Sequence, residues 1–332
     1  MRETSARRKN YLVLSAIASI VVLVLLPPVL PTYLIILLTQ ALIFSVVAMS
    51  LDLLIGYTAL GALGHGTFFA MGAYATAILT TRYGHGFGVS LIAGIGLAAT
   101  VSALVGLFAL RATGIYFLLI SLSIAMCVWG LAYQWVSVTG GENGITGIER
   151  PRMLFDMSIP LHWYYFIVVA FAISFLLMFL LIRSPFGRTM VGIRDSTLRM
   201  KVLGYNTWLH RYFAFIISGA FAGGAGTLYA FYNSYVSPND GDLGLCFKLV
   251  LMVTIGGPGT LIGACIGAFI ITFLENILST LTDRYLILIA FVYVLSAMYF
   301  PQGILGGVRN LLRGFGGNRI PAADQYLNKS AQ

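Results

Sequence analysis

Long apolar runs follow one another along almost the whole chain, and this pattern leaves few folds open to it. An α-helix needs about 20 mostly apolar residues to cross the hydrocarbon core of a bilayer, and many of the runs reach that length. Only 9% of the 332 residues are charged, whereas roughly 25% are charged in soluble domains. The sequence therefore predicts an all-α, polytopic membrane protein.

The runs predict about ten transmembrane or half-membrane helices. The first run leads through Pro27 and Pro28 into the second, which favours a transmembrane helix over a cleaved signal peptide. The run 246–256 is short for a full crossing, so we expect a half-helix there. In chain order the predicted spans are about 11–30, 33–55, 67–81, 88–110, 114–136, 161–182, 212–234, 246–256, 260–280 and 285–300.

One long polar segment, 183–211, interrupts the apolar runs. Its only acidic residue is Asp195, and its six basic residues are Arg183, Arg188, Arg194, Arg199, Lys201 and Arg211. Excess Lys and Arg in short loops stay on the cytoplasmic side of a membrane. We therefore predict a cytoplasmic loop that is large enough for another protein to grip.

The distribution of charge predicts which side each loop faces. With both termini, Arg111 and the segment 183–211 inside, 15 of the 20 basic residues are cytoplasmic, as the positive-inside rule expects. The basic residues left outside are Arg82, Arg150, Arg152, Lys248 and Arg284. The predicted divisions are a cytoplasmic tail at 1–10, a first transmembrane half at 11–182, the loop at 183–211, a second half at 212–301 and a cytoplasmic tail at 302–332.

Two stretches, 53–77 and 253–277, share one pattern: an apolar run, a glycine-rich break and a helix of small residues. Unwound backbone in lipid leaves polar groups unpaired, so such breaks must be buried in protein or line a wet cavity. Interrupted spans in two halves of a chain point to a substrate pathway. The alternative is that the glycines only allow tight helix packing. The glycines concerned are Gly56, Gly64, Gly66, Gly256, Gly257 and Gly259.

Asp52 and Glu275 are the acidic residues inside predicted spans, where ionisable groups are costly and often functional. Asp52 either serves the pathway, is solvated near the cytoplasmic end of its helix, or caps a helix start in the break. Glu275 either serves the pathway or pairs with Arg284 or a partner subunit. His65 and Gln40 either contact substrate or satisfy structural hydrogen bonds.

Catalytic and cofactor motifs are missing from the sequence. It contains no GxxxxGK(S/T) nucleotide loop, no nucleophile elbow and no HExxH, and its histidines and carboxylates lack metal-ligand spacing. The three cysteines lie in or beside apolar runs and suggest no disulfide. We expect no enzyme activity, no cofactor and, despite a net charge of +9, no nucleic-acid partner. Energy for transport would come from an ion gradient or from separate ATPase subunits.

Four motifs in a fixed order carry a family resemblance. They are LDLLIGY at 51–57 with LGHG at 63–66 and GAY at 72–74, TGG at 139–141 with NGITGI at 143–148, SPFGR at 184–188 through IRD at 193–195 to LG at 203–204, and IGGPGT at 255–260. With them the chain resembles the permease subunits of branched-chain amino-acid ABC importers, the longer of the two permease types. Importers of urea and short amides look similar, so the solute stays open.

The resemblance implies that 184–204 is a coupling loop whose short helix docks on a cytoplasmic ATPase. The positions that match the family are Arg188, Arg194, Asp195, Leu203 and Gly204. Where the family usually has small and acidic residues, this chain has Ser196, Thr197, Arg199, Met200 and Lys201, so its docking contacts would differ in detail. Gly204 after Leu203 is expected to end the helix as a left-handed cap.

The resemblance also implies partners and a location. They are two cytoplasmic ATPase subunits that bind ATP, a homologous second permease, a soluble periplasmic binding protein that sets specificity, and the bacterial inner membrane. Two alternatives remain from the residues alone. One is an ion-coupled secondary transporter with Asp52 and Glu275 as ion or proton sites. The other is a membrane-embedded enzyme using His65 and Asp52.

Overall fold

The computed structural model describes residues 27–151, 157 and 159–281, together with 284, 287, 288, 291 and 303. Within these residues the chain forms eleven α-helices and one two-stranded sheet, which confirms the predicted all-α fold class. The predicted spans at 11–30 and 285–300 and both tails lie wholly or mostly outside the described residues.

Six of the described helices have the length and apolar composition needed to cross a membrane. Their bounds follow the predicted spans to within about five residues, and the largest difference is at α10, which begins inside the polar segment 183–211. They are α2 (Thr32–Thr58), α4 (Phe87–Ala109), α5 (Ile115–Gln134), α7 (Pro160–Arg183), α10 (Thr207–Asn233) and α12 (Leu261–Leu281). The predicted span at 67–81 is α3 (His65–Tyr83), which is less apolar and lies against α10 and α4.

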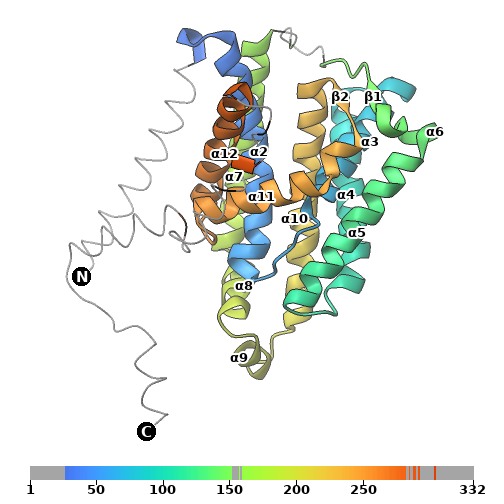
Figure 1. The fold of residues 1–332 in the computed structure, drawn as a ribbon. Helices are drawn as coiled ribbons and strands as arrows, with labels where there is room; N and C mark the ends of the chain where they lie inside the picture. Colours follow the sequence, from blue (N-terminus) through green and yellow to red (C-terminus); the bar gives the residue numbers. More distant parts are fainter. Residues whose placement is uncertain are drawn as a thin grey trace.

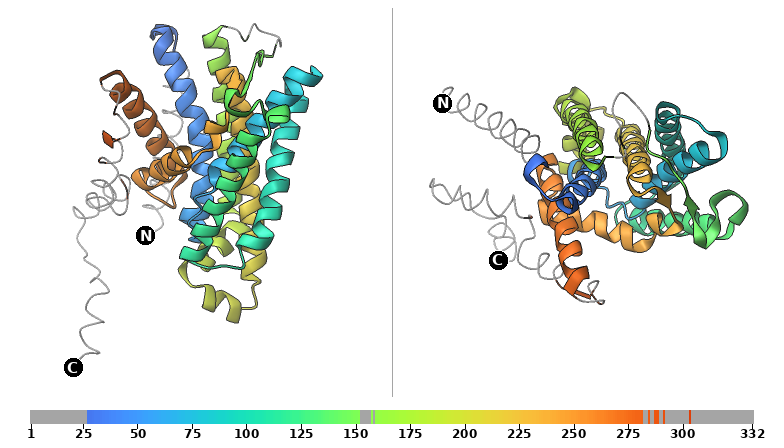
Figure 2. Two further views of the ribbon diagram at one scale, coloured as in Figure 1. Left: turned by 45° about the vertical axis from the view of Figure 1, so that its right-hand side comes forward. Right: turned by 90° about the horizontal axis from the view of Figure 1, so that it is seen from above.

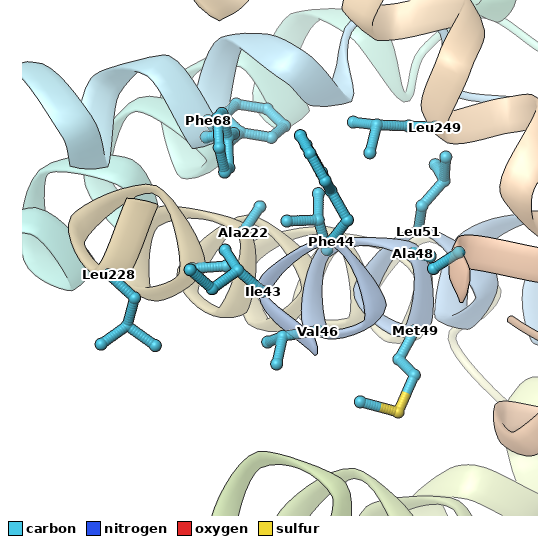
Figure 3. Packing of buried hydrophobic residues seen from close by; sticks show 14 of the residues in the cluster. Ile43, Phe44, Val46, Ala48, Met49, Leu51, Phe68, Ala222, Leu228 and Leu249 are labelled. Carbon is cyan, nitrogen blue, oxygen red and sulfur yellow. The ribbon is translucent and has the colours of Figure 1, made fainter. Parts of the chain in front are cut away.

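The central helix of the fold is α2, which contacts α7, α10, α11 and α12 (Figure 1). Its sequence is apolar on every side, as expected of a helix surrounded by protein, and residues 41–54 are all buried. Figure 3 shows Phe44 on the side of α3 and α11, near Phe68 and Leu249, while Val46 and Met49 leave α2 on the opposite side. If α2 moves, the helices packed around it must therefore move as well.

Small residues let α10 pack closely on two other helices. An added Cβ at Gly223 would collide with Ala98 of α4, and one at Gly219 would lie 2.5 Å from the Ser102 Cβ. On the α3 side, an added Cβ at Gly226 would overlap the Phe69 carbonyl. Gly219 and Gly223 have the GxxxG spacing, which lets helix backbones approach closely.

Gly226→Ala is expected to lower the thermal stability of the purified protein. The added methyl would force α10 away from the α3 backbone, and overpacking of this kind costs about 1–3 kcal/mol. The matched control is Gly130→Ala in α5, where nothing lies within 4 Å of the added Cβ. Unfolding temperatures measured in detergent should fall for the first variant and hold for the second. Equal values would contradict the packing described here.

A short sheet joins two predicted loops at the end of the bundle away from 183–211. Strand β1 (Ile145–Thr146) pairs antiparallel with β2 (Tyr235–Val236). Arg150 adds bonds from its Nε to the Phe231 carbonyl, at 3.3 Å, and from its Nη2 to the Tyr232 carbonyl, at 3.1 Å. The sequence did not predict this pairing, because two-residue strands have no periodicity. Between α5 and β1 the chain also forms α6 (Val136–Thr139) and η2 (Gly141–Asn143).

The short helix α11 (Leu243–Gly256) lies across the long helices instead of along them (Figures 1 and 2). It follows η3 (Pro238–Gly241), and its N-cap is Asp242, whose Oδ1 accepts from the Leu245 N–H at 2.7 Å. Close packing on α12 fixes its other end, because an added Cβ at Gly256 or Gly267 would overlap the backbone of the opposite helix. The predicted half-helix exists, but it does not run toward the other side of the membrane.

Candidate functional site

The polar segment 183–211, for which the family resemblance implies a loop with a short helix, is mostly helical. It forms α8 (Pro185–Asp195) and α9 (Thr197–Val202), which lie at one end of the bundle, with α9 at the tip (Figure 1). Ser184 caps α8 by accepting from the Gly187 N–H at 3.3 Å, and Pro185 occupies the first helical position. Met190 and Ile193 are buried, so α8 is anchored to the bundle while its charged side faces out.

A glycine cap ends α9 as predicted. Gly204 has φ of +86°, in the left-handed region. Its N–H donates to the Lys201 carbonyl and the Tyr205 N–H donates to the Met200 carbonyl, both at 3.0 Å, which is the Schellman arrangement. The cap turns the chain sharply and leaves three apolar side chains exposed at the tip: Leu198 at 73%, Val202 at 81% and Leu203 at 69%.

Arg194 connects α8 to the central helix α2. Its Nη1 donates to the Gly56 carbonyl at 2.7 Å, while its Nε and Nη2 each donate to the Asp195 Oδ1 at 3.1 Å. The last carbonyls of a helix lack intrahelical partners, and α2 ends at Thr58. The guanidinium therefore satisfies a group that the end of α2 leaves open.

The segment after α11 docks on the same turn of α2. Asp52 is fully buried, and its Oδ1 accepts from the Gly259 N–H at 2.7 Å. An added Cβ at Gly56 would overlap the Gly259 backbone nitrogen, and one at Gly259 would lie 3.2 Å from Arg194 Nη1. The structure thus brings together Arg194, Gly56, Asp52 and Gly259, which we call the junction. Among the residues that the structure describes, the Asp52 Oδ2 has no hydrogen-bond partner.

The first glycine break is shorter than predicted. The sequence places it at 56–66, but α2 continues through Gly56 to Thr58 and α3 begins at His65. The prediction fails at Gly56 because that glycine serves the contact with Gly259 instead of unwinding the helix. Asp52 likewise does not cap a helix start in its own break, since it binds the second one.

The other break glycines are close-packing positions. An added Cβ would overlap the Ser121 carbonyl at Gly64, lie 2.9 Å from the Cys246 Sγ at Gly66, and overlap the Gly263 carbonyl at Gly256. Gly257 adopts φ of +110°, so it supplies the turn that ends α11. Of the two alternatives, tight packing accounts for these positions. Passage of substrate along them stays a prediction.

His65 joins the start of α3 to α2. Its Nε2 lies 2.8 Å from the Ser50 Oγ, which itself donates to the Val47 carbonyl at 2.7 Å. Because the Ser50 hydroxyl donates its proton to the Val47 carbonyl, it must accept from His65, and we assign the imidazole proton to Nε2 of His65. The side chain is buried, and its Nδ1 has no partner among the described residues. These contacts fit a structural hydrogen bonder.

Glu275 of α12 forms an ion pair with Lys248 of α11. Its pairing with Arg284 or with a partner subunit stays a prediction. Lys248 Nζ also lies 4.4 Å from the ring centroid of Phe44. The sequence counts Lys248 among the basic residues outside, and the structure places it within α11 and not in a loop. Gln40 lies one helical turn from Phe44 on α2 and is half-buried, away from the junction.

Comparison with known proteins agrees with this architecture. Residues 33–299 match the family described as branched-chain amino acid transport system / permease component. The chain belongs to this family. The permease is 28% identical over 300 residues to the high-affinity branched-chain amino acid transport system permease protein LivM of Escherichia coli, covering 83% of this chain and 70% of that one. It is 29% identical over 209 residues to the autoinducer 2 import system permease protein LsrC of Yersinia pseudotuberculosis, covering 58% and 57%.

The permease matches no solved structure. Family membership and the apolar helices make it a multi-pass inner-membrane protein and a transport subunit of the ABC permease type. The glycine breaks and the rare acid selected Asp52, Gly56 and Gly259, and the family resemblance selected Arg194; the structure joins these four residues. Sequence reasoning missed Lys248 and Phe44, although a lysine inside an apolar stretch was a usable signal.

Proposed function

We propose that the permease carries branched-chain or other hydrophobic amino acids into the cell, driven by ATP hydrolysis on separate subunits. The names of the LivM relatives support the solute class. One observation carries the coupling: Arg194, on a helix at the exposed end of the bundle, donates to the carbonyl of Gly56, where the segment after α11 also docks. A displacement of α8 is thereby passed directly to α2.

The proposed cycle begins at α9. Its exposed Leu198, Val202 and Leu203 form an apolar tip that an ATPase subunit covers. When two such subunits close on ATP, they move α9 and α8 together, because Met200 of α9 packs on Gly192 of α8. Arg188 and the Gly204 cap belong to the same docking surface. The junction then shifts α2 and the segment at 257–260 relative to each other, and the pathway changes its access.

The remaining partners and orientation are also proposals. The end that carries 183–211, and both termini, face the cytoplasm, as the basic residues there favour. A second, homologous permease completes the pathway, and a soluble periplasmic binding protein delivers the solute to the opposite end. The pathway candidates away from the junction are Gln40, Gly64, His65, Gly66, Gly256, Gly257 and Glu275.

A second function has one observation in its favour. The buried Asp52 Oδ2 without a partner among the described residues is the kind of group that a proton or cation site uses. On that basis the permease would be an ion-coupled secondary transporter. It would then transport when reconstituted alone.

Reconstitution separates these functions. The permease is purified with the proposed ATPase, second-permease and binding-protein subunits and placed in proteoliposomes with internal ATP. We expect ATP-dependent accumulation of L-leucine and little of urea or acetamide. Accumulation by the permease alone, with an ion gradient and no ATP, would overturn the ATP-driven function, and preference for urea or acetamide would overturn the solute class.

Val202→Asp is expected to weaken ATPase binding at least about tenfold, because a charge in an apolar contact must be desolvated. The matched control is Val136→Asp at the other end of the bundle, where Val136 is 64% exposed. Co-purification of the ATPase in titrated detergent extracts measures the effect. If both variants retain the ATPase equally, the α9 tip is not its docking surface.

A further inference from the structure

An ion pair lies about halfway along the central helix. Lys248 of α11 and Glu275 of α12 pair beside Phe44, which is near the middle of α2 (Thr32–Thr58). Their side chains are 17% and 24% exposed, so neither is sealed inside the protein. Ionised side chains at membrane depth face protein or water and not lipid. The open side of this pair therefore meets a wet space or another polypeptide.

Stability does not account for the pair. Removing two charges from water costs about as much as their mutual attraction returns, and well-packed apolar residues often replace such a pair without loss. α11 and α12 are already held together by the contacts of Gly256 and Gly267. The pair is thus available for a role other than joining these two helices.

Aromatic rings form a wall beside the two charges. The Phe44 ring lies 6.1 Å from that of Phe69 and 5.8 Å from that of Tyr229, and the Phe69 and Tyr229 rings are 5.1 Å apart. Lys248 Nζ rests over the Phe44 ring, which holds the ammonium by a cation–π contact. A cation, an anion and an apolar aromatic surface therefore meet at one place.

We propose that Lys248, Glu275 and Phe44 form a binding station for zwitterionic free amino acids. The ligand's carboxylate pairs with Lys248, its ammonium pairs with Glu275, and its apolar side chain lies on the Phe44 ring. Each protein charge exchanges one partner for another, so no charge is left unpaired at membrane depth. A ligand with one charge or none would leave Lys248 or Glu275, or both, without a charged partner. The station is therefore selective for free amino acids.

This inference rests on the proposed function and specifies how the solute is recognised on its way. The Lys248–Glu275 pair would also act as a gate. Without ligand the two side chains contact each other, and with ligand they are held apart. Urea and simple amides carry neither charge and gain nothing at this station.

The deciding variant removes both charges together, as Lys248→Met with Glu275→Gln. Because no unpaired charge remains, it should fold and assemble, with an unfolding temperature and ATPase co-purification close to those of the unchanged complex. We expect L-leucine uptake by the reconstituted complex to fall at least about tenfold, since the station loses its charge-assisted contacts. Uptake equal to that of the unchanged complex would show that the pair is only structural and would overturn the station.

A second measurement does not depend on transport. In the purified complex in nanodiscs, an amine-reactive reagent in excess over the added compound modifies Lys248. Mass spectrometry follows its rate relative to that of the other lysines of the complex, because the free amines of L-leucine and isopentylamine also consume the reagent. L-leucine is expected to slow this modification severalfold, whereas isopentylamine and 4-methylpentanoate, which each carry one of its two charges, should not. Equal rates with all three would overturn the station. A complex that protects Lys248 but shows no ATP-dependent uptake would refute the proposed function and leave the station standing.

Discussion

Arg194→Glu is expected to reduce ATP-dependent uptake at least about 100-fold, which corresponds to about 2.7 kcal/mol. The guanidinium now donates to the Gly56 carbonyl and to Asp195, and hydrogen bonds from a charged donor contribute about 1.5–3 kcal/mol. A glutamate could donate to neither, and its carboxylate would face the Gly56 carbonyl oxygen and the nearby Asp52. The contact between α8 and α2 would be replaced by repulsion.

The control for this variant is Arg111→Glu, in the turn between α4 and α5 at the same end of the bundle (Figure 1). It makes the same change of charge at an exposed residue outside the junction. The control should keep membrane insertion and ATPase co-purification, and its uptake should exceed half of the uptake by the unchanged complex. Normal uptake with Arg194→Glu, or an equal loss in both variants, would remove Arg194 from the coupling.

Gly56→Ala is expected to uncouple the complex, so that ATP hydrolysis continues while uptake falls at least about tenfold, or about 1.4 kcal/mol. Alanine is a better helix former than glycine by about 1 kcal/mol, so α2 itself should not suffer. The added methyl, however, would overlap the Gly259 nitrogen and the Asp52 Oδ1. The segment after α11 would be pushed off α2, and the junction would open.

Gly96→Ala in α4 is the matched control, because nothing lies within 4 Å of an added Cβ there. The measurement is the number of L-leucine molecules accumulated per ATP hydrolysed in proteoliposomes. We expect this ratio to drop for Gly56→Ala and to stay constant for Gly96→Ala. A constant ratio in both would mean that the contact of Gly56 with Gly259 does not transmit movement.

The long helices were predictable because an apolar run of sufficient length has one stable form in a bilayer. The spans at 33–55 and 161–182 correspond to α2 and α7 with little change at either end. The direction of α11 was not predictable, because an apolar segment of 14 residues reads the same along or across the membrane. Its direction depends on the docking of 257–260 on α2, which local sequence does not encode.

The candidate site divides in the same way. Asp52 and Glu275 stood out because charges are rare in apolar runs, and Arg194 stood out through the family motif. Their partners could not be inferred. Asp52 binds a backbone amide 207 residues away, and Arg194 binds a carbonyl 138 residues away. Backbone groups are present at every position, so no pattern of residue types singles out the one that is used.

The choice of a carbonyl as the acceptor for Arg194 has a genetic consequence. In a link between two charged side chains, damage to one can be repaired by a reciprocal exchange at the other. Here every amino acid at position 56 presents the same oxygen, so no replacement at that position can compensate for a lost guanidinium. Suppressors of defects at residue 194 should therefore arise elsewhere, in residues that bring a new donor to the end of α2.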